Sequence, residues 1–127
     1  MKRILLYFGL VLALGIGVSG CYKDIIKPDL PKDPNAPPQQ VSFANELKPL
    51  FAASCTDVGC HVSGAHKPYL TADVSYNEIV NGGFINLQLP TQSILIKLLN
   101  GDMQQYMPSA DNRQKVLDWI RNGAPNN

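Results

Sequence analysis

The sequence carries little net charge, and this excludes one large class of partner. Its 127 residues hold 11 Lys and Arg against 10 Asp and Glu, a formal net charge of +1. Within residues 41–127, six Lys and Arg oppose seven Asp and Glu. A nucleic-acid-binding domain usually has a basic patch or stripe, so we expect no nucleic-acid partner. The sequence also has no internal repeat and no glycine-rich phosphate-binding loop.

Long hydrophobic runs are scarce as well. One apolar stretch extends from Ile4 to Val18, and it is short for a transmembrane helix, which needs about 20 residues. The stretch follows the basic start Met1-Lys2-Arg3 and precedes the small residues Ser19-Gly20. This order is typical of a secretory signal peptide, which we assign to residues 1–20.

The end of this segment, Val18-Ser19-Gly20-Cys21, resembles the bacterial lipobox. The resemblance implies that Cys21 is lipidated and becomes the mature N-terminus. Several acyl chains would then anchor the protein firmly, since one chain alone binds a membrane only marginally. The implied location is the bacterial cell envelope, on the periplasmic side or the outer-membrane or cell-surface side. The alternative is an ordinary signal peptide followed by a chance cysteine.

Residues 21–40 are rich in proline and polar residues, and five prolines lie between positions 28 and 38. Such a segment cannot bury a core and is expected to form an extended, semi-rigid spacer. We therefore interpret it as a tether. Residues 41–127 are left as one small domain, and a domain of this size often needs a disulfide, metal or cofactor to be stable.

The sequence has only three cysteines, and two of them lie in the run Cys55-Thr-Asp-Val-Gly-Cys60-His61. Two thiols followed directly by an imidazole resemble the haem attachment site of c-type cytochromes. In that family the usual spacing is Cys-x-x-Cys-His, whereas four residues separate the cysteines here. Residues 56–59 must therefore loop out, and Gly59 makes that bend easier. The resemblance implies one haem c, attached covalently to Cys55 and Cys60, with His61 as the proximal ligand of its iron.

The dipeptide Met107-Pro108 supplies a candidate for the second axial ligand. In c-type cytochromes the ligand methionine commonly precedes a proline, so the resemblance implies that Met107 is the distal ligand. Met103 competes for this role, while His66 is too close to His61 in sequence to reach the other haem face easily. A thioether ligand raises the reduction potential. With both axial positions filled, the site would pass electrons and would not act as an enzyme.

The spacing of apolar residues predicts four short helices. The first has Ser42 as its cap and extends to Phe51, with a kink or break at Pro49. The second covers residues 75–80, begins with a Ser75-x-x-Glu capping box and ends at a glycine pair.

The third and fourth predicted helices lie close to the C-terminus. The third covers residues 94–99, where Ser93 as a possible cap favours a helix over a strand. The fourth has Asp111 as an acidic cap, with Gln114 three residues later, and ends at Gly123. No strand or hairpin pattern of comparable strength is present, so the predicted fold class is all-α.

The order of these elements over residues 41–127 resembles a class I cytochrome c domain. The resemblance implies a small helical domain packed around one covalently attached haem. It also implies that the first and last helices cross, bringing Leu47, Leu50 and Phe51 towards Trp119. The expected function is that of a membrane-anchored single-electron carrier, whose protein donor and acceptor the sequence does not name.

Two other interpretations stay open at this point. The chain could be a non-haem lipoprotein module that acts in binding or assembly. A Cys55–Cys60 disulfide would then close a short loop in an oxidising compartment, and His61 would be an ordinary surface residue. Alternatively, a haem with an open sixth position would give a peroxidase-like enzyme or a sensor.

Overall fold

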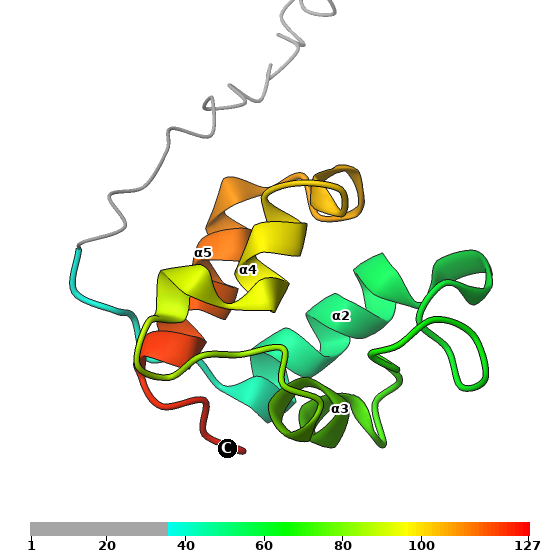
Figure 1. The fold of residues 1–127 in the computed structure, drawn as a ribbon, viewed down its shortest axis with the longest axis horizontal. Helices are drawn as coiled ribbons and strands as arrows, with labels where there is room; N and C mark the ends of the chain where they lie inside the picture. Colours follow the sequence, from blue (N-terminus) through cyan, green and yellow to red (C-terminus); the bar gives the residue numbers. More distant parts are fainter. Residues whose placement is uncertain (1–35) are drawn as a thin grey trace, which may run out of the picture.

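The fold was obtained as a computed structural model, which describes residues 36–127. The described residues form helices and turns and contain no strand, so the predicted all-α class is confirmed for this part of the chain (Figure 1). The α-helices are α2 (Lys48–Cys55), α3 (Ser75–Asn81), α4 (Ile94–Leu99) and α5 (Ala110–Arg121). Within the described range, no helix has the length and apolar character needed to cross a membrane. The predicted signal peptide, Cys21 and most of the tether lie outside the described residues.

The first helix begins as a π-helical turn, Phe43–Leu47, and continues directly as α2. Ser42 caps it as predicted, since its Oγ accepts a hydrogen bond from the Asn45 N–H at 3.1 Å. The helix changes from π to α just before Pro49, which therefore lies in the first turn of α2, where a missing N–H is tolerated. The helix continues to Cys55, so the cysteine motif begins on the helix itself.

The predicted caps of α3 and α5 are wrong. The Ser75 hydroxyl is buried without a hydrogen-bond partner among the described residues. Glu78, its expected reciprocal cap, instead accepts a hydrogen bond from the Tyr69 N–H at 3.4 Å. The α5 helix begins earlier than predicted, because the Ser109 Oγ accepts from the Asn112 N–H at 3.3 Å. Helix α3 therefore has no side-chain cap, and the cap of α5 is a serine two residues before the predicted one.

Helix α4 occupies the predicted residues, and a loop packs against its start. The Ser93 Oγ does not cap α4 but accepts a hydrogen bond from the Asn86 N–H at 2.9 Å. The Leu95 N–H donates to the Phe84 carbonyl at 2.9 Å. These two bonds hold the loop after α3 against α4 and place Phe84 next to the start of that helix.

The hydrophobic core lies where the first helix meets α3 and α5. Trp119 is fully buried, and its ring centroid lies 5.2 Å from that of Phe43 and 6.3 Å from that of Tyr76. Leu47 and Phe51 are buried in the same cluster, as the predicted helix crossing requires, whereas Leu50 is only partly buried. The π-helical turn therefore provides the ring contact with the last helix.

Asn127 covers the beginning of the first helix. Its backbone carbonyl accepts hydrogen bonds from the Ala44 N–H at 2.7 Å and from the Ser42 hydroxyl at 2.9 Å. Its side-chain oxygen accepts from the Phe43 N–H at 2.9 Å. The first N–H groups of a helix have no partner within the helix, so this contact satisfies two of them. The C-terminal segment thus fixes the end of the domain at which residues 36–40 enter.

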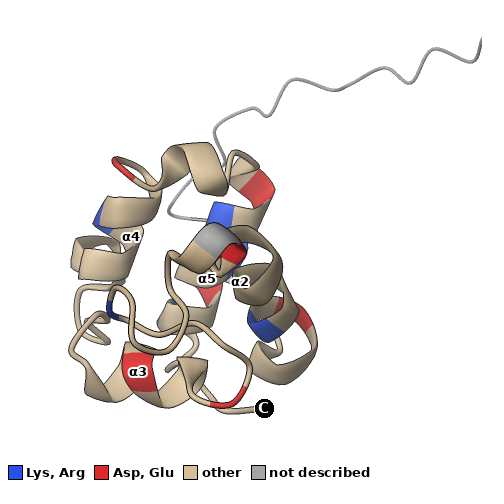
Figure 2. Cartoon of the chain, turned by 90° about the vertical axis from the view of Figure 1, so that its right-hand side faces the viewer, with Lys and Arg blue, Asp and Glu red and all other residues tan. Residues whose placement is uncertain are grey.

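Charged residues of both signs are distributed over the helices and loops of the chain (Figure 2). Several are paired, as in the ion pairs of Lys115 with Glu46 at 2.9 Å and of Arg121 with Asp118 at 3.3 Å. No block of one charge stands out in that view.

Candidate functional site

Backbone hydrogen bonds close the loop that carries the cysteine motif. The His61 N–H donates to the Cys55 carbonyl at 3.1 Å, and the Cys60 N–H donates to the Asp57 carbonyl at 3.1 Å. A 3-10 turn at residues 57–59 takes up the extra residues, and Gly59 has a φ of +82°, a conformation that favours glycine. The longer spacing therefore still returns the chain to the end of α2, where His61 begins the next loop.

Two carbonyl groups orient the His61 ring. Its Nδ1 lies 2.9 Å from the Pro68 carbonyl oxygen and 3.1 Å from the His66 carbonyl oxygen. Both partners only accept, so Nδ1 must carry the proton, and in the neutral ring Nε2 keeps its lone pair. A metal-ligating histidine is usually held in this way by a partner on its other nitrogen. The Leu70 N–H closes the same loop by donating to the His61 carbonyl at 2.7 Å.

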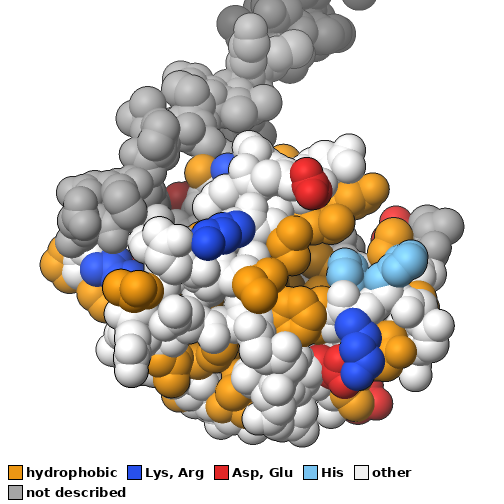
Figure 3. Space-filling model, in the orientation of Figure 1, with side chains coloured by type: hydrophobic (Ala, Val, Ile, Leu, Met, Phe, Trp, Pro, Cys, Tyr) orange, Lys and Arg blue, Asp and Glu red, His pale blue; other side chains and the backbone are white. Residues whose placement is uncertain are grey.

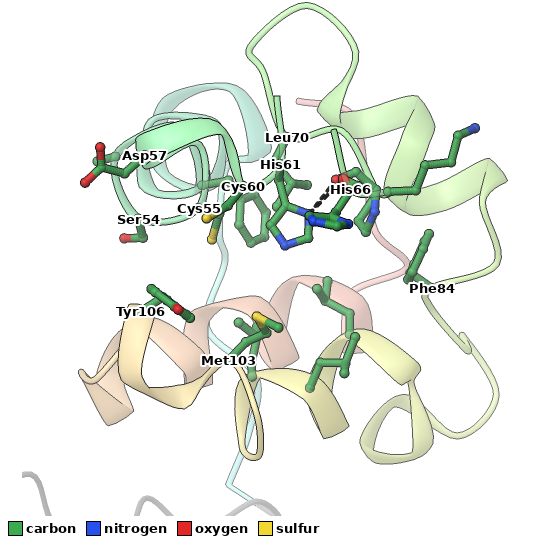
Figure 4. A pocket seen from close by; sticks show the side chains of 17 residues that line it. Ser54, Cys55, Asp57, Cys60, His61, His66, Leu70, Phe84, Met103 and Tyr106 are labelled. Carbon is green, nitrogen blue, oxygen red and sulfur yellow. Dashed lines mark hydrogen bonds between the residues drawn. The ribbon is translucent and has the colours of Figure 1, made fainter. Parts of the chain in front are cut away.

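A cavity of about 850 Å³ opens beside this loop. Pockets that enclose a small ligand or cofactor usually measure about 300–1,000 Å³, so the space suits a molecule of this size. Figure 3 shows hydrophobic side chains around a hollow next to the two histidines. Figure 4 shows that Cys55, Cys60 and His61 lie on one wall, with Met103 and Tyr106 on the opposite wall.

The remaining walls of the cavity are largely apolar. The side chains that line it from the helices and loops around are Phe51, Pro68, Leu70, Phe84, Leu95, Leu98 and Leu99. Apolar walls of this kind favour a flat, mostly hydrophobic ligand, because each part of its surface that leaves water contributes to binding. The exposed residues Cys60, His66 and Tyr106 lie at the rim, so one edge of a bound ligand would stay accessible.

The two candidate distal ligands lie in different places. Met103 is half-buried and lines the cavity, and Figure 4 shows it facing the wall that carries His61. Met107, which the Met-Pro dipeptide favoured, is not among the lining residues and is buried in the core with 1% exposure. Met103, and not Met107, thus lies at the cavity, and the methionine that would bind a metal stays a prediction. A 3-10 turn, Gln104–Tyr106, separates the two methionines and directs them to different surroundings.

The two thiols have different environments. Cys55 is half-buried at the end of α2, whereas Cys60 is exposed, and both are free thiols in this structure. Burial, together with the nearby Cys60 thiol, raises the pKa of Cys55 from 9.0 to about 11. The Cys55 thiol is therefore protonated at neutral pH. Its residue forms part of the cavity wall.

These residues fit the demands of a haem group. Within the described part of the chain, no three His, Cys, Asp or Glu side chains gather as a site for a bare metal ion would require. A haem iron needs only one protein donor on each face, because the macrocycle supplies the other donors. His61 Nε2 and the Met103 sulfur lie on opposite walls, and both thiols lie beside His61. Two thiols, an imidazole and a thioether are thus gathered around one cavity.

Comparison of the chain with protein-family models, curated proteins and solved structures finds no match. No family is therefore assigned to this chain, and its function is proposed from the site itself.

Sequence reasoning found the cysteines and His61 but missed the residues that orient and surround them. The Pro68 carbonyl fixes the His61 tautomer, yet no local pattern marks a backbone carbonyl as a hydrogen-bond partner. From the sequence, Leu95 and Leu99 look like ordinary core residues. In the structure they belong to the core and also form part of the cavity wall. Their double role depends on how α4 packs, which the sequence pattern alone does not contain.

Proposed function

We propose that this protein is a membrane-anchored single-electron carrier with one covalently bound haem c. The observation that carries the proposal is the His61 ring, whose Nδ1 is bound to two carbonyl groups beside an apolar cavity that also holds both motif cysteines. A bound haem would supply a one-electron couple at its iron. The residues of this chain would hold that group, orient it and keep its iron from binding other molecules.

Cys55 and Cys60 would make the attachment permanent. In each case the thiol adds across one vinyl group: the sulfur bonds to one vinyl carbon and the thiol hydrogen goes to the other. This addition needs no oxidant or reductant, but it requires both thiols to be reduced. The free state of both cysteines in the structure is compatible with that requirement.

His61 and a methionine from residues 103–107 would occupy the two axial positions. The fixed proton on Nδ1 leaves Nε2 as the metal-binding atom of His61. Met103 is the thioether favoured by the cavity geometry, and Met107 is the one favoured by the Met-Pro sequence. A soft, neutral sulfur ligand favours ferrous iron and raises the reduction potential. With no open position on the iron, electron transfer is favoured over substrate chemistry.

Lipidation of Cys21 would keep this carrier at a membrane of the bacterial cell envelope. The proline-rich residues 21–40 would act as a spacer between the lipid and the domain. Substitution Cys21→Ser is expected to release the folded, haem-loaded protein into the soluble fraction, and unchanged membrane association would contradict the anchor. This part of the proposal can fail without affecting the haem site.

The deciding experiment is expression of the full chain together with haem-maturation machinery. We expect a red protein with a Soret band and a mass increase of one haem that survives denaturation. The double substitution Cys55→Ser/Cys60→Ser, made in the same way, should lose the covalent haem. A colourless, folded protein whose mass is lower by two hydrogens than that of the dithiol would instead support the disulfide-bonded binding or assembly module.

A matched pair of variants identifies the distal ligand. In c-type cytochromes a weak far-red absorption band of the oxidised protein marks methionine ligation of the iron, and we expect this band here. Its loss in Met103→Ala but not in Met107→Ala would identify Met103, and the reverse result would identify Met107. If untreated, reduced wild-type protein binds carbon monoxide readily, the iron has an open position and the enzyme or sensor interpretation is favoured.

A further inference from the structure

Both candidate distal ligands lie in one short connection between α4 and α5. This connection, residues 100–109, is seen in Figure 1 as the segment that follows α4 and leads into α5. Its backbone bonds are local: the Gln104 N–H donates to Gly101, and the Tyr106 N–H donates to Met103. The Met103 N–H also donates to the Leu98 carbonyl at 2.9 Å, which joins the start of the segment to α4, and the buried Met107 side chain joins its end to the core.

One side chain from α5 joins the two ends of this connection. The Arg113 Nε–H donates to the Asn100 side-chain oxygen at 3.1 Å. Its Nη1–H donates to the Met107 carbonyl at 2.7 Å and also to the Pro108 carbonyl. The planar guanidinium group presents several donors in a fixed fork, so a single residue spans the beginning and the end of the segment.

Arg113 is well suited to this task because its acceptors lie at both ends of the segment. Asn100 ends α4 and Pro108 lies in the turn before α5, and both are exposed. Hydrogen bonds from a charged donor are stronger than bonds between neutral groups. The hydrogen bonds of this guanidinium to Asn100, Met107 and Pro108 all go to this segment.

We propose that Arg113 is a positioning residue for the distal thioether ligand, and that it acts by clamping residues 100–108 in the conformation that presents the sulfur to the cavity. This inference rests on the proposed haem function with Met103 as the ligand, because Met103 lines the cavity in this conformation whereas Met107 lies in the core. Without the clamp, the segment opens more often and the sulfur leaves the axial position for a larger fraction of the time.

The test compares Arg113→Ala and Arg113→Lys with Arg121→Ala in the full, haem-loaded protein. Arg121 is the control, because it lies on the same helix and its guanidinium donates a hydrogen bond to Asp118 on α5. Loss of one charge-assisted hydrogen bond shifts an equilibrium by roughly tenfold. We therefore expect carbon monoxide to bind reduced R113A about tenfold faster than wild-type protein, with a weaker far-red band. Lysine keeps the charge but not the fork, so R113K should be intermediate.

Hydrogen exchange supplies a readout that does not depend on the iron. Amides of residues 103–107 should exchange faster in R113A than in R121A, because a released segment opens locally. The proposal would be overturned if R113A matched R121A in three measurements. These are the intensity of the far-red band, the rate of carbon monoxide binding and the exchange rates of the amides of residues 103–107. If R113A does not fold, R113K decides in its place, and wild-type behaviour in all three measurements would again overturn it. A colourless wild-type protein would refute the proposed function, while the exchange measurement would still test the clamp.

Discussion

The different environments of Cys55 and Cys60 lead to a prediction about reactivity in the haem-free protein. Burial is the main cause that raises the pKa of Cys55 to about 11, and the Cys60 thiol adds to it. Only the thiolate attacks an electrophile or a disulfide. The Cys55 thiol should therefore react much more slowly in the folded protein than in the unfolded chain.

The size of the effect follows from two opposing factors. A rise of two pH units in the pKa, from 9.0 to about 11, lowers the thiolate fraction at pH 8 roughly a hundredfold. A thiolate of higher pKa is a better nucleophile, and this recovers about a factor of ten. The net expectation is a Cys55 reaction about tenfold slower than that of an unperturbed thiol. The limited access to the half-buried sulfur slows it further.

The pH dependence separates the pKa from simple access. Between pH 8 and pH 10 the thiolate fraction of a group with a pKa near 11 rises roughly a hundredfold, whereas that of an ordinary thiol with a pKa of 9.0 rises only about tenfold. The assay is reaction of haem-free protein with a small disulfide reagent, followed by site-resolved mass spectrometry. Unfolded protein is the control. A tenfold rise at Cys55 in the folded state would refute the reasoning, because it would mean that the sulfur is not desolvated.

Two further predictions concern stability, and denaturant unfolding followed by circular dichroism measures both. Trp119→Ala removes a fully buried ring and should lower the free energy of unfolding by about 3–5 kcal/mol. A loss below about 1 kcal/mol would show that the core is not built around this residue. Ser42→Ala removes the first helix cap and should cost about 1 kcal/mol. Substitution of the exposed Ser63 is its control, and equal effects at the two serines would contradict the capping contact.

Local sequence patterns predicted the helices better than their caps. The apolar spacing around Phe51 and Trp119 defined the first and last helices, because burying an apolar face is what stabilises a short helix in a protein. Ser75 and Asp111 looked like caps, but α3 has no side-chain cap and α5 is capped by Ser109. Whether a serine caps a helix depends on the burial and backbone conformation at that position, and packing buries Ser75 completely.

The candidate ligands show the same division. Cys55, Cys60 and His61 are neighbours in sequence, so a motif was sufficient to name them. The distal side is different, because Met103 and Met107 lie on a separate segment whose path depends on α4, α5 and Arg113. A Met-Pro dipeptide cannot indicate which sulfur lies at the cavity and which lies in the core.

The amino-acid sequence by itself determined the helical class, the site of the two thiols and the imidazole beside them, since these follow from residue type and short-range spacing. Only the tertiary structure shows which nitrogen of His61 is protonated, that a cavity lies beside this ring, and which methionine lines that cavity. The cavity depends on segments distant in sequence, because α4 and the loop that bears His61 both line it, whereas the His61 tautomer depends on carbonyl groups five and seven residues away. Short-range patterns carry no information about how such segments pack, because their packing is determined by the shape of the whole core.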